Sequence, residues 1–381
     1  MKKQPFDMRA IIRPDLLELP GYVPITPTDV LAERYGIPPE AVLKLDGNEN
    51  PYGTSPKALA AIAAERSYHI YPDPDQTRVR AALADHLGVT ADSIVCGLGS
   101  DDLIDLILRA VIVPGAGSRG RRDAVINCPP TFGMYPFSTE IAGGRVIDVP
   151  RLEGFALDLD GIERAADHAK LIFLASPNNP TGNRMSADEL ERLLATGMLV
   201  VVDEAYIEFA GSHGGPASFV PLVASNENLV VLRTFSKWGG LAGLRAGYGV
   251  MSPALASILM TIKQPYNLNV AAGVAMLATL EDKALLDERA CKIAGTRERL
   301  SAALDAIGWI TTYPSEANFL LCRLDGVDAV EVRDRLASRG IFVRHFDTPA
   351  LRNHLRISVG LEEHVAPVIE ALRQIGAELG R

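Results

Sequence analysis

Between residues 93 and 251, seven short apolar runs alternate with segments of helical pattern, and this alternation constrains the fold more than any other feature of the chain. It is typical of consecutive strand–helix units that build a mostly parallel sheet. The runs are almost continuously apolar and rich in Val and Ile, as in strands that are covered by helices on both faces. We therefore predict an α/β fold with a seven-stranded, mostly parallel central sheet. Its strands are expected at 93–96, 124–127, 145–149, 171–175, 199–202, 229–232 and 247–250.

The pattern changes after residue 270. Residues 270–307 have a helical pattern throughout, so we expect one long helical stretch that leads out of the sheet. The first ~46 residues are rich in proline and contain no sheet-like run, so we expect them to pack on a second domain or to reach a neighbouring subunit. A smaller α+β domain follows, with strands expected at 319–322, 342–344 and 355–359 and helices at 327–338 and 362–379. The predicted parts are 1–46 (N-terminal arm and part of the small domain), 47–281 (large domain) and 282–381 (small domain).

Composition excludes several classes of protein. Of the 381 residues, 48% are hydrophobic and 22% are charged, which is typical of a globular protein. A formal net charge of −9 argues against a nucleic-acid partner but leaves room for a local basic pocket. We expect a cytoplasmic protein without membrane contacts, because no apolar segment reaches the length of a signal peptide core or of the ~20 residues that span a membrane. The cysteines lack metal-binding spacing, which predicts no metal site and buried free thiols at Cys96, Cys128, Cys291 and Cys322.

Lys237 is the strongest candidate for chemistry. A lysine amine can form a Schiff base with a carbonyl, and pyridoxal 5'-phosphate (PLP) is its commonest cofactor partner. Most lysines are solvated surface charges. Lys237 differs because an apolar run delivers it into a glycine-rich segment, Gly-Gly-Leu-Ala-Gly-Leu, at 239–244.

Polar residues that follow other runs are the next candidates, because open parallel sheets bind ligands beyond the carboxyl ends of their strands. Asp203 follows the fifth run, where a carboxylate could keep a pyridinium nitrogen protonated. Alone, it would equally suit a helix cap or a Mg²⁺ ligand. Asn179 lies in a proline-flanked turn after the fourth run, and Tyr206 follows Asp203 by three residues. Given Lys237, we expect Asn179 and Tyr206 to donate hydrogen bonds to the cofactor's phenolate oxygen, although turn chemistry alone would explain Asn179.

A phosphate site is expected where the segment Gly-Leu-Gly-Ser-Asp-Asp at 97–102 opens a helix, because free N–H groups at a helix start bind phosphate. The signal is weak alone, since the acids also suit a helix cap. It gains force from Ser236 and Arg245, a hydroxyl and a guanidinium on either side of Lys237 that would complete the cradle together with Ser100 and Asp101.

Three further residues have two interpretations each. Phe132 follows the second run and would either stack on a planar cofactor or belong to the core. Arg344 and Arg356 lie near strand ends in the small domain, where they would either clamp an anionic substrate or form surface ion pairs.

Together these motifs resemble the fold-type I PLP-dependent aminotransferases over nearly the whole chain. The combination is specific: Asn-Pro-Thr-Gly at 179–182, Asp-Glu-Ala-Tyr at 203–206, and Ser-Lys at 236–237 followed eight residues later by Arg245. Within that superfamily, three segments are similar to the histidinol-phosphate aminotransferase family: Leu-Asp-Gly-Asn-Glu-Asn-Pro-Tyr-Gly at 45–53, Tyr-Pro-Asp at 71–73 and Leu-Ala-Gly-Leu-Arg at 241–245. The chain departs from the family at Asp102, where glutamate is usual, and at Phe132, where tyrosine is common.

The resemblance implies a role for each candidate. Lys237 would form the Schiff base with PLP and then move the substrate's Cα proton, while Asp203 would pair with the ring nitrogen. Asn179 and Tyr206 would contact the ring oxygen. The residues expected at the cofactor phosphate are Ser100, Asp101, Ser236, Arg245 and, from the other subunit of a homodimer with shared sites, Tyr71. The residues expected at the substrate are Tyr22, Asn48, Arg344 and Arg356.

The implied reaction moves an amino group between L-glutamate and imidazole-acetol phosphate, a step of histidine biosynthesis that yields the phosphorylated amino alcohol L-histidinol phosphate. An aromatic amino acid aminotransferase and a threonine-phosphate decarboxylase share the architecture and remain alternatives. A non-catalytic regulator built on the same fold is disfavoured by Lys237 and by the lack of a separate DNA-binding segment. A nucleotide-binding protein is disfavoured because the glycine loop at 97–102 has neither of the usual phosphate-loop spacings.

Overall fold

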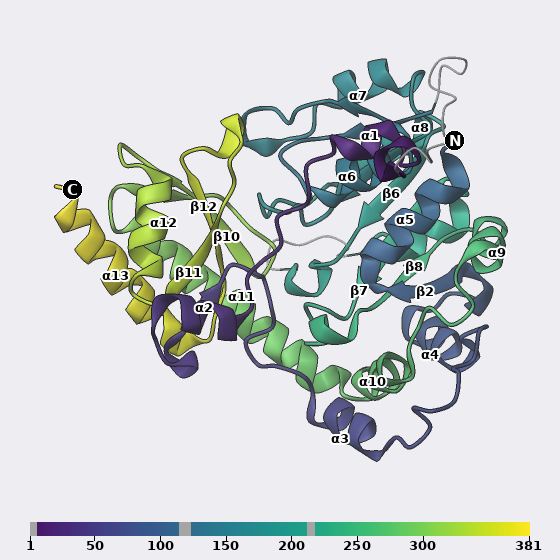
Figure 1. The fold of residues 1–381 in the computed structure, drawn as a ribbon, viewed down its shortest axis with the longest axis horizontal. Coiled ribbons are helices and arrows are strands. Elements are labelled where there is room, and N and C mark those ends of the chain that lie inside the picture. Colours follow the sequence, from purple (N-terminus) through teal and green to yellow (C-terminus); the bar gives the residue numbers. More distant parts are fainter. Residues whose placement is uncertain (1–5, 114–122, 212–217) are drawn as a thin grey trace.

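The computed structural model describes residues 6–113, 123–211 and 218–381. These residues build a seven-stranded sheet and a smaller five-stranded sheet, and the long helix α11 (Lys283–Asp305) runs between the two (Figure 1). The predicted α/β class with a second, smaller α+β part is confirmed. The division of the chain after residues 46 and 281 stays a prediction.

The large sheet has the strand order β2-β8-β7-β6-β5-β3-β4. Neighbouring strands are parallel except for β8, which is antiparallel to both β2 and β7. All seven predicted strands are confirmed, and their ends differ from the prediction by at most two residues. The strands are β2 (Ile94–Leu98), β3 (Ala124–Asn127), β4 (Arg145–Asp148), β5 (Leu171–Ala175), β6 (Leu199–Asp203), β7 (Leu229–Thr234) and β8 (Ala246–Val250).

Helices cover both faces of this sheet, as the apolar runs predict. Along β6, Val200 and Val202 belong to a core that includes residues of α8, whereas Val201 belongs to a core that includes residues of α5. Both faces of the strand are therefore buried, because side chains alternate between the two faces. The helices of this part are α3 (Pro56–Ala64), α4 (Thr77–Leu87), α5 (Gly99–Val111), α6 (Met134–Ile141), α7 (Leu159–Ala166), α8 (Ala187–Ala195), α9 (Pro253–Ile262) and α10 (Val270–Glu281).

The small sheet has the strand order β1-β11-β12-β10-β9. Residues of α11, α12 (Ala329–Ala337) and α13 (Val365–Glu378) form its core together with the strands. The predicted strands and helices of this part are present. The strands are β1 (Leu43–Leu45), β9 (Ile310–Thr312), β10 (Phe319–Leu324), β11 (Ile341–His345) and β12 (His354–Ser358).

Two predictions about elements are wrong. The first 46 residues do contain a strand, β1, which pairs in parallel with β11. A strand of three residues is too short to show a pattern in the sequence, and it forms because a strand distant in sequence pairs with it. The expected single helical stretch at 270–307 is two helices, α10 and α11, that meet at Asp282. The Asp282 carboxylate accepts a hydrogen bond from the backbone N–H of Lys57 in α3, at 3.3 Å, which fixes the break.

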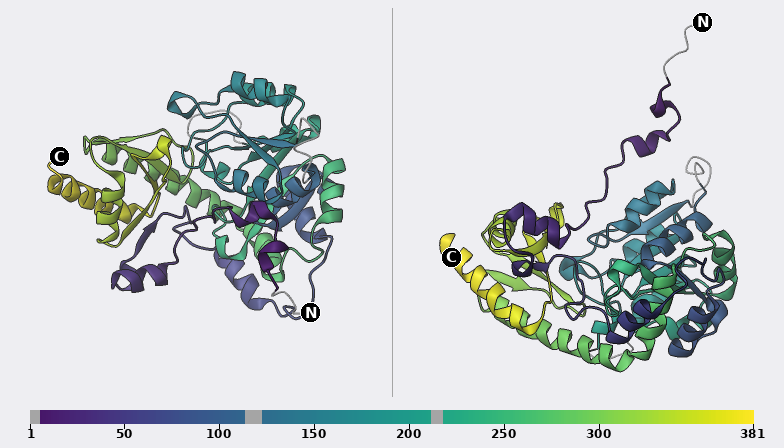
Figure 2. Two further views of the ribbon diagram at one scale, coloured as in Figure 1. Left: turned by 45° about the horizontal axis from the view of Figure 1, so that its top comes forward. Right: turned by 60° about the horizontal axis from the view of Figure 1, so that its bottom comes forward.

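The N-terminal arm contacts both parts of the molecule. Arg13, just before α1 (Pro14–Leu17), donates a hydrogen bond to the carbonyl of Ile141 in α6 at 2.9 Å. Tyr35, at the end of α2 (Thr28–Tyr35), packs edge-on against Phe342 of the small sheet, with ring centroids 5.1 Å apart. Figure 2 shows the first helices of the arm, in purple, extending from the body of the molecule.

Three of the four cysteines are buried free thiols, as predicted: Cys96, Cys128 and Cys322. The prediction is wrong for Cys291, which is exposed on α11 because it lies on the side of that helix that faces solvent. Among the described residues, no helix has the length and apolar character needed to cross a membrane.

Candidate active site

A cavity of about 380 Å³ opens beyond the carboxyl ends of the central strands of the large sheet. All of the predicted cofactor residues except Tyr71 line it. They come from segments that follow five different strands, which meet at one edge because most of the strands are parallel. Those residues are Ser100, Asp101, Phe132, Asn179, Asp203, Tyr206, Ser236, Lys237 and Arg245.

Lys237 reaches the cavity from a turn that begins at the end of β7. Its amine donates a hydrogen bond to the carbonyl of Gly47 at 2.9 Å and lies 5.9 Å from the centroid of the Tyr206 ring. Burial, together with the nearby Arg356 guanidinium, lowers the pKa of Lys237 to about 8. A buried amine with this pKa is neutral often enough near physiological pH to act as a nucleophile and as a base.

The glycines after Lys237 close this turn tightly. Gly240 has a φ of +65°, and a Cβ there would lie 2.5 Å from the carbonyl oxygen of Gly53. A Cβ on Gly239 would lie 2.9 Å from the carbonyl oxygen of Phe235. Only glycine fits both positions, because backbone atoms of other residues lie directly against them. The two glycines therefore allow the tight turn that carries Lys237.

Asp203 ends β6 and is buried. Its carboxylate accepts hydrogen bonds from the Tyr135 hydroxyl and from the backbone N–H of Ala205, both at 3.1 Å. Burial raises the pKa of Asp203 to about 7, while the Tyr135 hydrogen bond opposes the rise and the charge of Asp101 adds to it. A nearby cation strongly stabilises the ionised form of a carboxyl group in this setting, and a protonated ring nitrogen would be such a cation.

Asn179 and Tyr206 lie on the side of the cavity nearest the small sheet. The side-chain oxygen of Asn179 accepts a hydrogen bond from Arg356 at 2.6 Å. The Tyr206 hydroxyl accepts one from the side-chain amide of Asn48 at 3.1 Å. Both cavity residues are thus held in place by residues outside the large sheet, which the sequence pattern alone did not indicate.

The predicted phosphate cradle is assembled at the start of α5. Asp101, in the first turn, accepts a hydrogen bond from Arg245 at 2.9 Å, and burial raises the pKa of Asp101 while Arg245 opposes the rise. Gly99 has a φ of +80°, and a Cβ on Gly247 of β8 would lie 2.5 Å from the carbonyl carbon of Gly99. Glycine at 247 therefore lets the helix start lie directly against β8, where its free N–H groups face the cavity together with Ser236.

Several contributors were missed from the sequence. Tyr135 lines the cavity beside Phe132, with ring centroids 5.5 Å apart at 83°. Its place in the first turn of a helix after β3 was a usable signal, because it lies on the same segment as Phe132. The carbonyl of Gly47 and the hydroxyl of Thr234, which accepts a hydrogen bond from the Ser236 N–H at 3.1 Å, gave no such signal.

The predicted substrate residues lie around the cavity rather than in its lining. Arg356 of β12 is buried and also donates to the carbonyl of Asp46, while Arg344, its partner on the neighbouring strand β11, donates to the carbonyl of Val23 at 3.0 Å. Arg356 therefore forms no surface ion pair, and that alternative is wrong. Tyr22 is exposed and approaches the segment at Gly133.

Asn48 and Tyr71 do not belong to the cavity lining. Asn48 is 1% exposed, and both polar atoms of its side chain are bonded inside the chain. Its predicted place at the substrate stays a prediction. Tyr71 is 78% exposed and stacks on Tyr266 at 4.5 Å, outside the cavity lining. Its predicted role in a partner's site stays a prediction.

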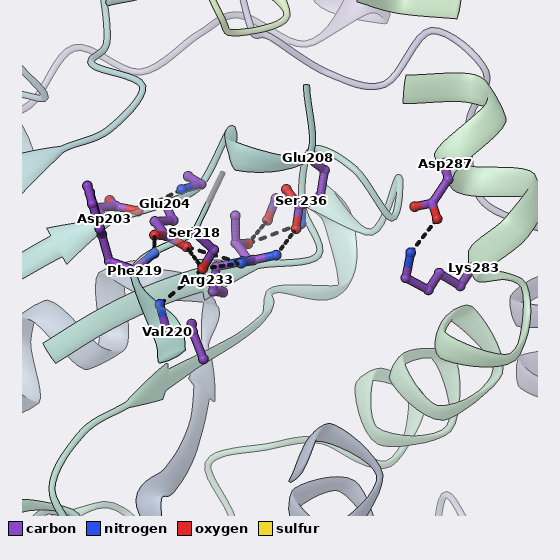
Figure 3. A network of polar contacts seen from close by, with 12 residues as sticks. Asp203, Glu204, Glu208, Ser218, Phe219, Val220, Arg233, Ser236, Lys283 and Asp287 are labelled. Carbon is purple, nitrogen blue, oxygen red and sulfur yellow. Dashed lines mark hydrogen bonds and ion pairs between the residues drawn. The ribbon is translucent and has the colours of Figure 1, made fainter. Parts of the chain in front are cut away.

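A buried ionic network supports the turn that carries Asp203 and Tyr206. Arg233 of β7 contacts Glu204 at 3.1 Å and Glu208 at 2.7 Å. Glu204 also accepts hydrogen bonds from the Ser218 hydroxyl at 2.7 Å and the Phe219 N–H at 2.6 Å. Figure 3 shows this network next to Asp203, and its contacts anchor the segment that follows β6.

The residues of the cavity fit PLP. The amine of lowered pKa matches the carbonyl of that cofactor, and the buried carboxylate matches its ring nitrogen. The aromatic ring matches the face of the cofactor ring, and the helix start with its arginine matches the phosphate.

Comparison with known proteins gives a consistent result. The sequence matches the family described as "Aminotransferase class I and II" over residues 40–372. A histidinol-phosphate aminotransferase from Roseiflexus castenholzii is 49% identical over 97% of this chain and 100% of its own length, and one from Dehalococcoides mccartyi is 43% identical over 97% and 99%. The crystal structure of histidinol-phosphate aminotransferase from Sinorhizobium meliloti in complex with pyridoxal-5'-phosphate superposes with a TM-score of 0.84, at 29% identity, and covers 97% of this chain and 98% of that one.

Proposed function

We infer the function from the premise that this chain belongs to the class I and II aminotransferase family and, within it, to the histidinol-phosphate aminotransferases. It is a PLP-dependent enzyme that transfers an amino group between L-glutamate and imidazole-acetol phosphate, a reaction of histidine biosynthesis. The observation that carries this function is the meeting in one cavity of the Lys237 amine with the buried carboxylate of Asp203.

Each part of the cofactor has a matching group on the chain. When bound, PLP supplies a carbonyl that links to amines and a ring that accepts electrons. Asp203 would hold a proton at the ring nitrogen, and Asn179 and Tyr206 would hold the ring oxygen. The N–H groups at the start of α5, with Ser100, Ser236 and Arg245, would bind the phosphate, while Asp101 keeps Arg245 in position. Phe132 would supply an aromatic contact for the ring.

Lys237 would move the proton. Its amine has a pKa of about 8, so near neutral pH it exchanges readily between the charged and neutral forms and can take a proton from the substrate Cα and return it. The carbonyl of Gly47 holds the amine at 2.9 Å and gives it a defined resting position on the cavity wall. Tyr206, whose ring lies next to that amine, would exclude water from it.

The two amino donors differ in the anion that they present. Glutamate carries a carboxylate on Cα, whereas histidinol phosphate carries none there and brings a phosphate instead. Arg356 and Arg344 lie side by side on neighbouring strands and would accept either anion, with Tyr22 contributing from the arm. The guanidinium of Arg356 already holds Asn179, so substrate binding and cofactor orientation share one residue.

The proposed enzyme is a homodimer with shared active sites. Tyr71 would contact the cofactor phosphate of the partner subunit, since within one chain it lies outside the cavity lining. A cytoplasmic location, predicted from the sequence, remains part of this proposal.

Reduction with borohydride tests the cofactor site. The purified enzyme loaded with PLP should absorb visible light, and reduction followed by peptide mapping should place the pyridoxyl group on Lys237. Lys237→Ala should abolish turnover while it retains part of the affinity for the cofactor, because the phosphate cradle is intact. Label on another lysine would contradict the assignment.

Substrate profiling tests the reaction. Catalytic efficiency for histidinol phosphate should exceed that for phenylalanine, tyrosine and threonine phosphate under one set of conditions. A preference for an aromatic amino acid would assign the chain to the aromatic aminotransferases, and CO₂ release from threonine phosphate would assign it to the decarboxylases. Arg356→Gln and Arg344→Gln should each weaken both proposed substrates by roughly 1.5 to 3 kcal/mol, the usual range for charged hydrogen bonds.

A further inference from the structure

Three residues from three distant parts of the chain form a buried chain of hydrogen bonds that ends at Tyr206. The Ser358 hydroxyl, on β12, lies 2.7 Å from the side-chain oxygen of Asn48 and accepts the Asn48 backbone N–H at 2.9 Å. The side-chain amide of Asn48 lies 3.1 Å from the Tyr206 hydroxyl. All three residues are buried, so water does not compete for these bonds.

The backbone holds Asn48 at the centre of this chain. Asn48 has a φ of +54°, a left-handed conformation that asparagine adopts more readily than most residues. Its carbonyl accepts a hydrogen bond from the side-chain amide of Asn318 at 2.9 Å. Backbone N–H, backbone carbonyl and both polar side-chain atoms of Asn48 are therefore all bonded, and the side chain has a single orientation.

The chain of bonds has a fixed direction. Ser358 already accepts the Asn48 N–H, and its one hydroxyl hydrogen needs an acceptor. In the described part of the chain, the side-chain oxygen of Asn48 is the acceptor to which it donates. The amide nitrogen of Asn48 then faces Tyr206 and donates to its oxygen. Tyr206 donates no hydrogen bond within the described residues, and it lines the cavity. Its hydroxyl hydrogen is consequently left to point toward the cavity.

The same strand carries the substrate arginine. Arg356 and Ser358 are two residues apart on β12 and so lie on one face of it. Arg356 donates to the carbonyl of Asp46, two residues before Asn48. Segment 46–48 is therefore contacted twice from β12. Arg356, which is proposed to bind the substrate anion, contacts Asp46, and Ser358 contacts Asn48.

We propose that Ser358 is a positioning residue that, acting through Asn48, fixes the Tyr206 hydroxyl as a hydrogen-bond donor to the cavity. The inference rests on the proposed function, because the group that receives the Tyr206 hydrogen is the ring oxygen of PLP. It gives Asn48 a role in orienting Tyr206.

The pH titration of the visible absorption band of the loaded enzyme tests this proposal. A donated hydrogen bond stabilises negative charge on the ring oxygen, so its loss makes the linked ring hold its proton to higher pH. Tyr206→Phe should move the midpoint of the titration to higher pH. Ser358→Ala should move it in the same direction, by roughly half a pH unit to one pH unit, the range that one hydrogen bond covers.

Two variants separate orientation from packing. Ser358→Thr keeps the hydroxyl and should keep the wild-type midpoint. If Ser358→Ala does not fold, Ser358→Cys, which fills the same space but is only a weak donor, takes its place and should move the midpoint to higher pH. Ser315→Ala removes another buried hydroxyl of the small-sheet part, one that donates to the carbonyl of Phe319 at 2.7 Å, and should leave the midpoint unchanged.

The double variant decides whether Ser358 acts through Tyr206. In a Tyr206→Phe background, Ser358→Ala should cause no further shift, because the hydroxyl that it orients is gone. Additive shifts, or an unchanged midpoint in Ser358→Ala alongside a shifted one in Tyr206→Phe, would overturn the inference and leave the proposed function intact. Absence of a visible band in the wild-type protein supplied with PLP would overturn both.

Discussion

The chemistry of single residues in this site follows from burial next to charge. Lys237 is the clearest case, because burial and Arg356 together bring its pKa to about 8, far from the value of 10.5 that a free lysine has. In the cofactor-free protein, Lys237 should react with an amine-selective acylating reagent with a pH midpoint near 8. Mass spectrometry of the labelled peptides at a series of pH values measures this midpoint directly.

A variant that removes a charge tests the direction in which Arg356 shifts the pKa of Lys237. Arg356→Gln should raise the midpoint, because a neighbouring positive charge disfavours the ammonium form. Arg344→Gln removes the same charge from the neighbouring strand and should leave the midpoint close to that of the wild type. If the two variants behaved alike, the effect would belong to net charge rather than to the contact.

Asp203 should make the stability of the cofactor-free protein depend on pH. Its pKa is about 7 when folded and 3.8 when exposed, so the folded state holds more protons between these values. Stability is then greatest below pH 4 for this group and falls as pH rises toward 7, by a total on the order of 4 kcal/mol. Urea unfolding at a series of pH values should show this fall in the wild type and lose it in Asp203→Asn.

Tyr135 provides the check on this assignment. Its hydroxyl donates to Asp203 and opposes the rise in the pKa of that carboxyl. In Tyr135→Phe the pKa should rise further, and the loss of stability should extend to higher pH. An identical pH dependence in wild type and Asp203→Asn would show that the slope comes from other groups.

Residues at strand ends were predictable from the pattern of apolar runs, whereas the contacts of Gly47 and Asn48 were not, although the family resemblance named Asn48. Asp203, Asn179 and Lys237 each follow an apolar run, and the geometry of parallel strands brings such residues to one edge. Gly47 and Asn48 meet Lys237 and Tyr206 only because the arm crosses from the small sheet at that point. Spacing along the chain does not contain that information.

At the scale of elements, the turn after β6 depends on a largely buried ion network, in which Glu204 has no exposed side-chain surface. Removing one partner of a buried pair leaves a charge without compensation, which costs about 3 to 5 kcal/mol. Arg233→Leu should destabilise the protein by that amount in urea unfolding, because Glu204 is fully buried.

An exposed pair supplies the comparison. Arg323 and Asp325 form an ion pair in which both side chains are about half exposed. Arg323→Leu should change stability by about 1 kcal/mol or less, since solvent screens such pairs. Equal losses of stability in the two leucine variants would mean that the Arg233 network is screened by solvent as much as the exposed pair is.

The start of α5 should be equally sensitive to one methyl group. Gly247→Ala places a Cβ 2.5 Å from the carbonyl carbon of Gly99, so the helix start must move away from β8. We expect roughly a tenfold or greater loss of affinity for PLP, measured by fluorescence titration, which matches the cost of overpacking. Gly295→Ala, in the middle of α11, adds a Cβ that lies 3.6 Å from the Arg299 side chain, its nearest neighbour apart from the backbone of its own helix. It should leave the affinity unchanged and raise stability by up to about 1 kcal/mol.

Strand β1 shows why some elements escape sequence analysis. Leu-Lys-Leu at 43–45 is too short for an alternation to register, and it becomes a strand because β11 offers a free edge. The seven strands of the large sheet, in contrast, carry their own signal, since both faces of each are apolar and the runs stand out from the helices.

At the scale of the whole molecule, the prediction with the widest reach is the shared site. Large apolar side chains remain exposed on the arm and next to Tyr71 in the sequence, among them Phe6, Ile11 and Ile70. A second copy of the chain that covers them would bring Tyr71 to the partner's cavity. Tyr71→Phe and Lys237→Ala subunits should each be poor in activity alone. Each heterodimer of the two should have about half of the wild-type activity, because one of its two sites is then intact, so an equal mixture, in which about half of the dimers are heterodimers, should reach about a quarter.

Heterodimers must be demonstrated with two differently tagged subunits. Equal mixing of wild-type and Lys237→Ala subunits serves as the control for exchange. Purified heterodimers without recovered activity would place Tyr71 in the site of its own chain.

The exposed thiol on α11 has a practical consequence. Burial raises the pKa of Cys96 and Cys128 to about 12 and that of Cys322 still higher, so these three react poorly with maleimides. Cys291 remains accessible, on the helix that runs between the two sheets. A fluorophore attached there to the unmodified sequence would report any tilt of the small sheet over the cavity as substrate arrives, without cysteine substitution.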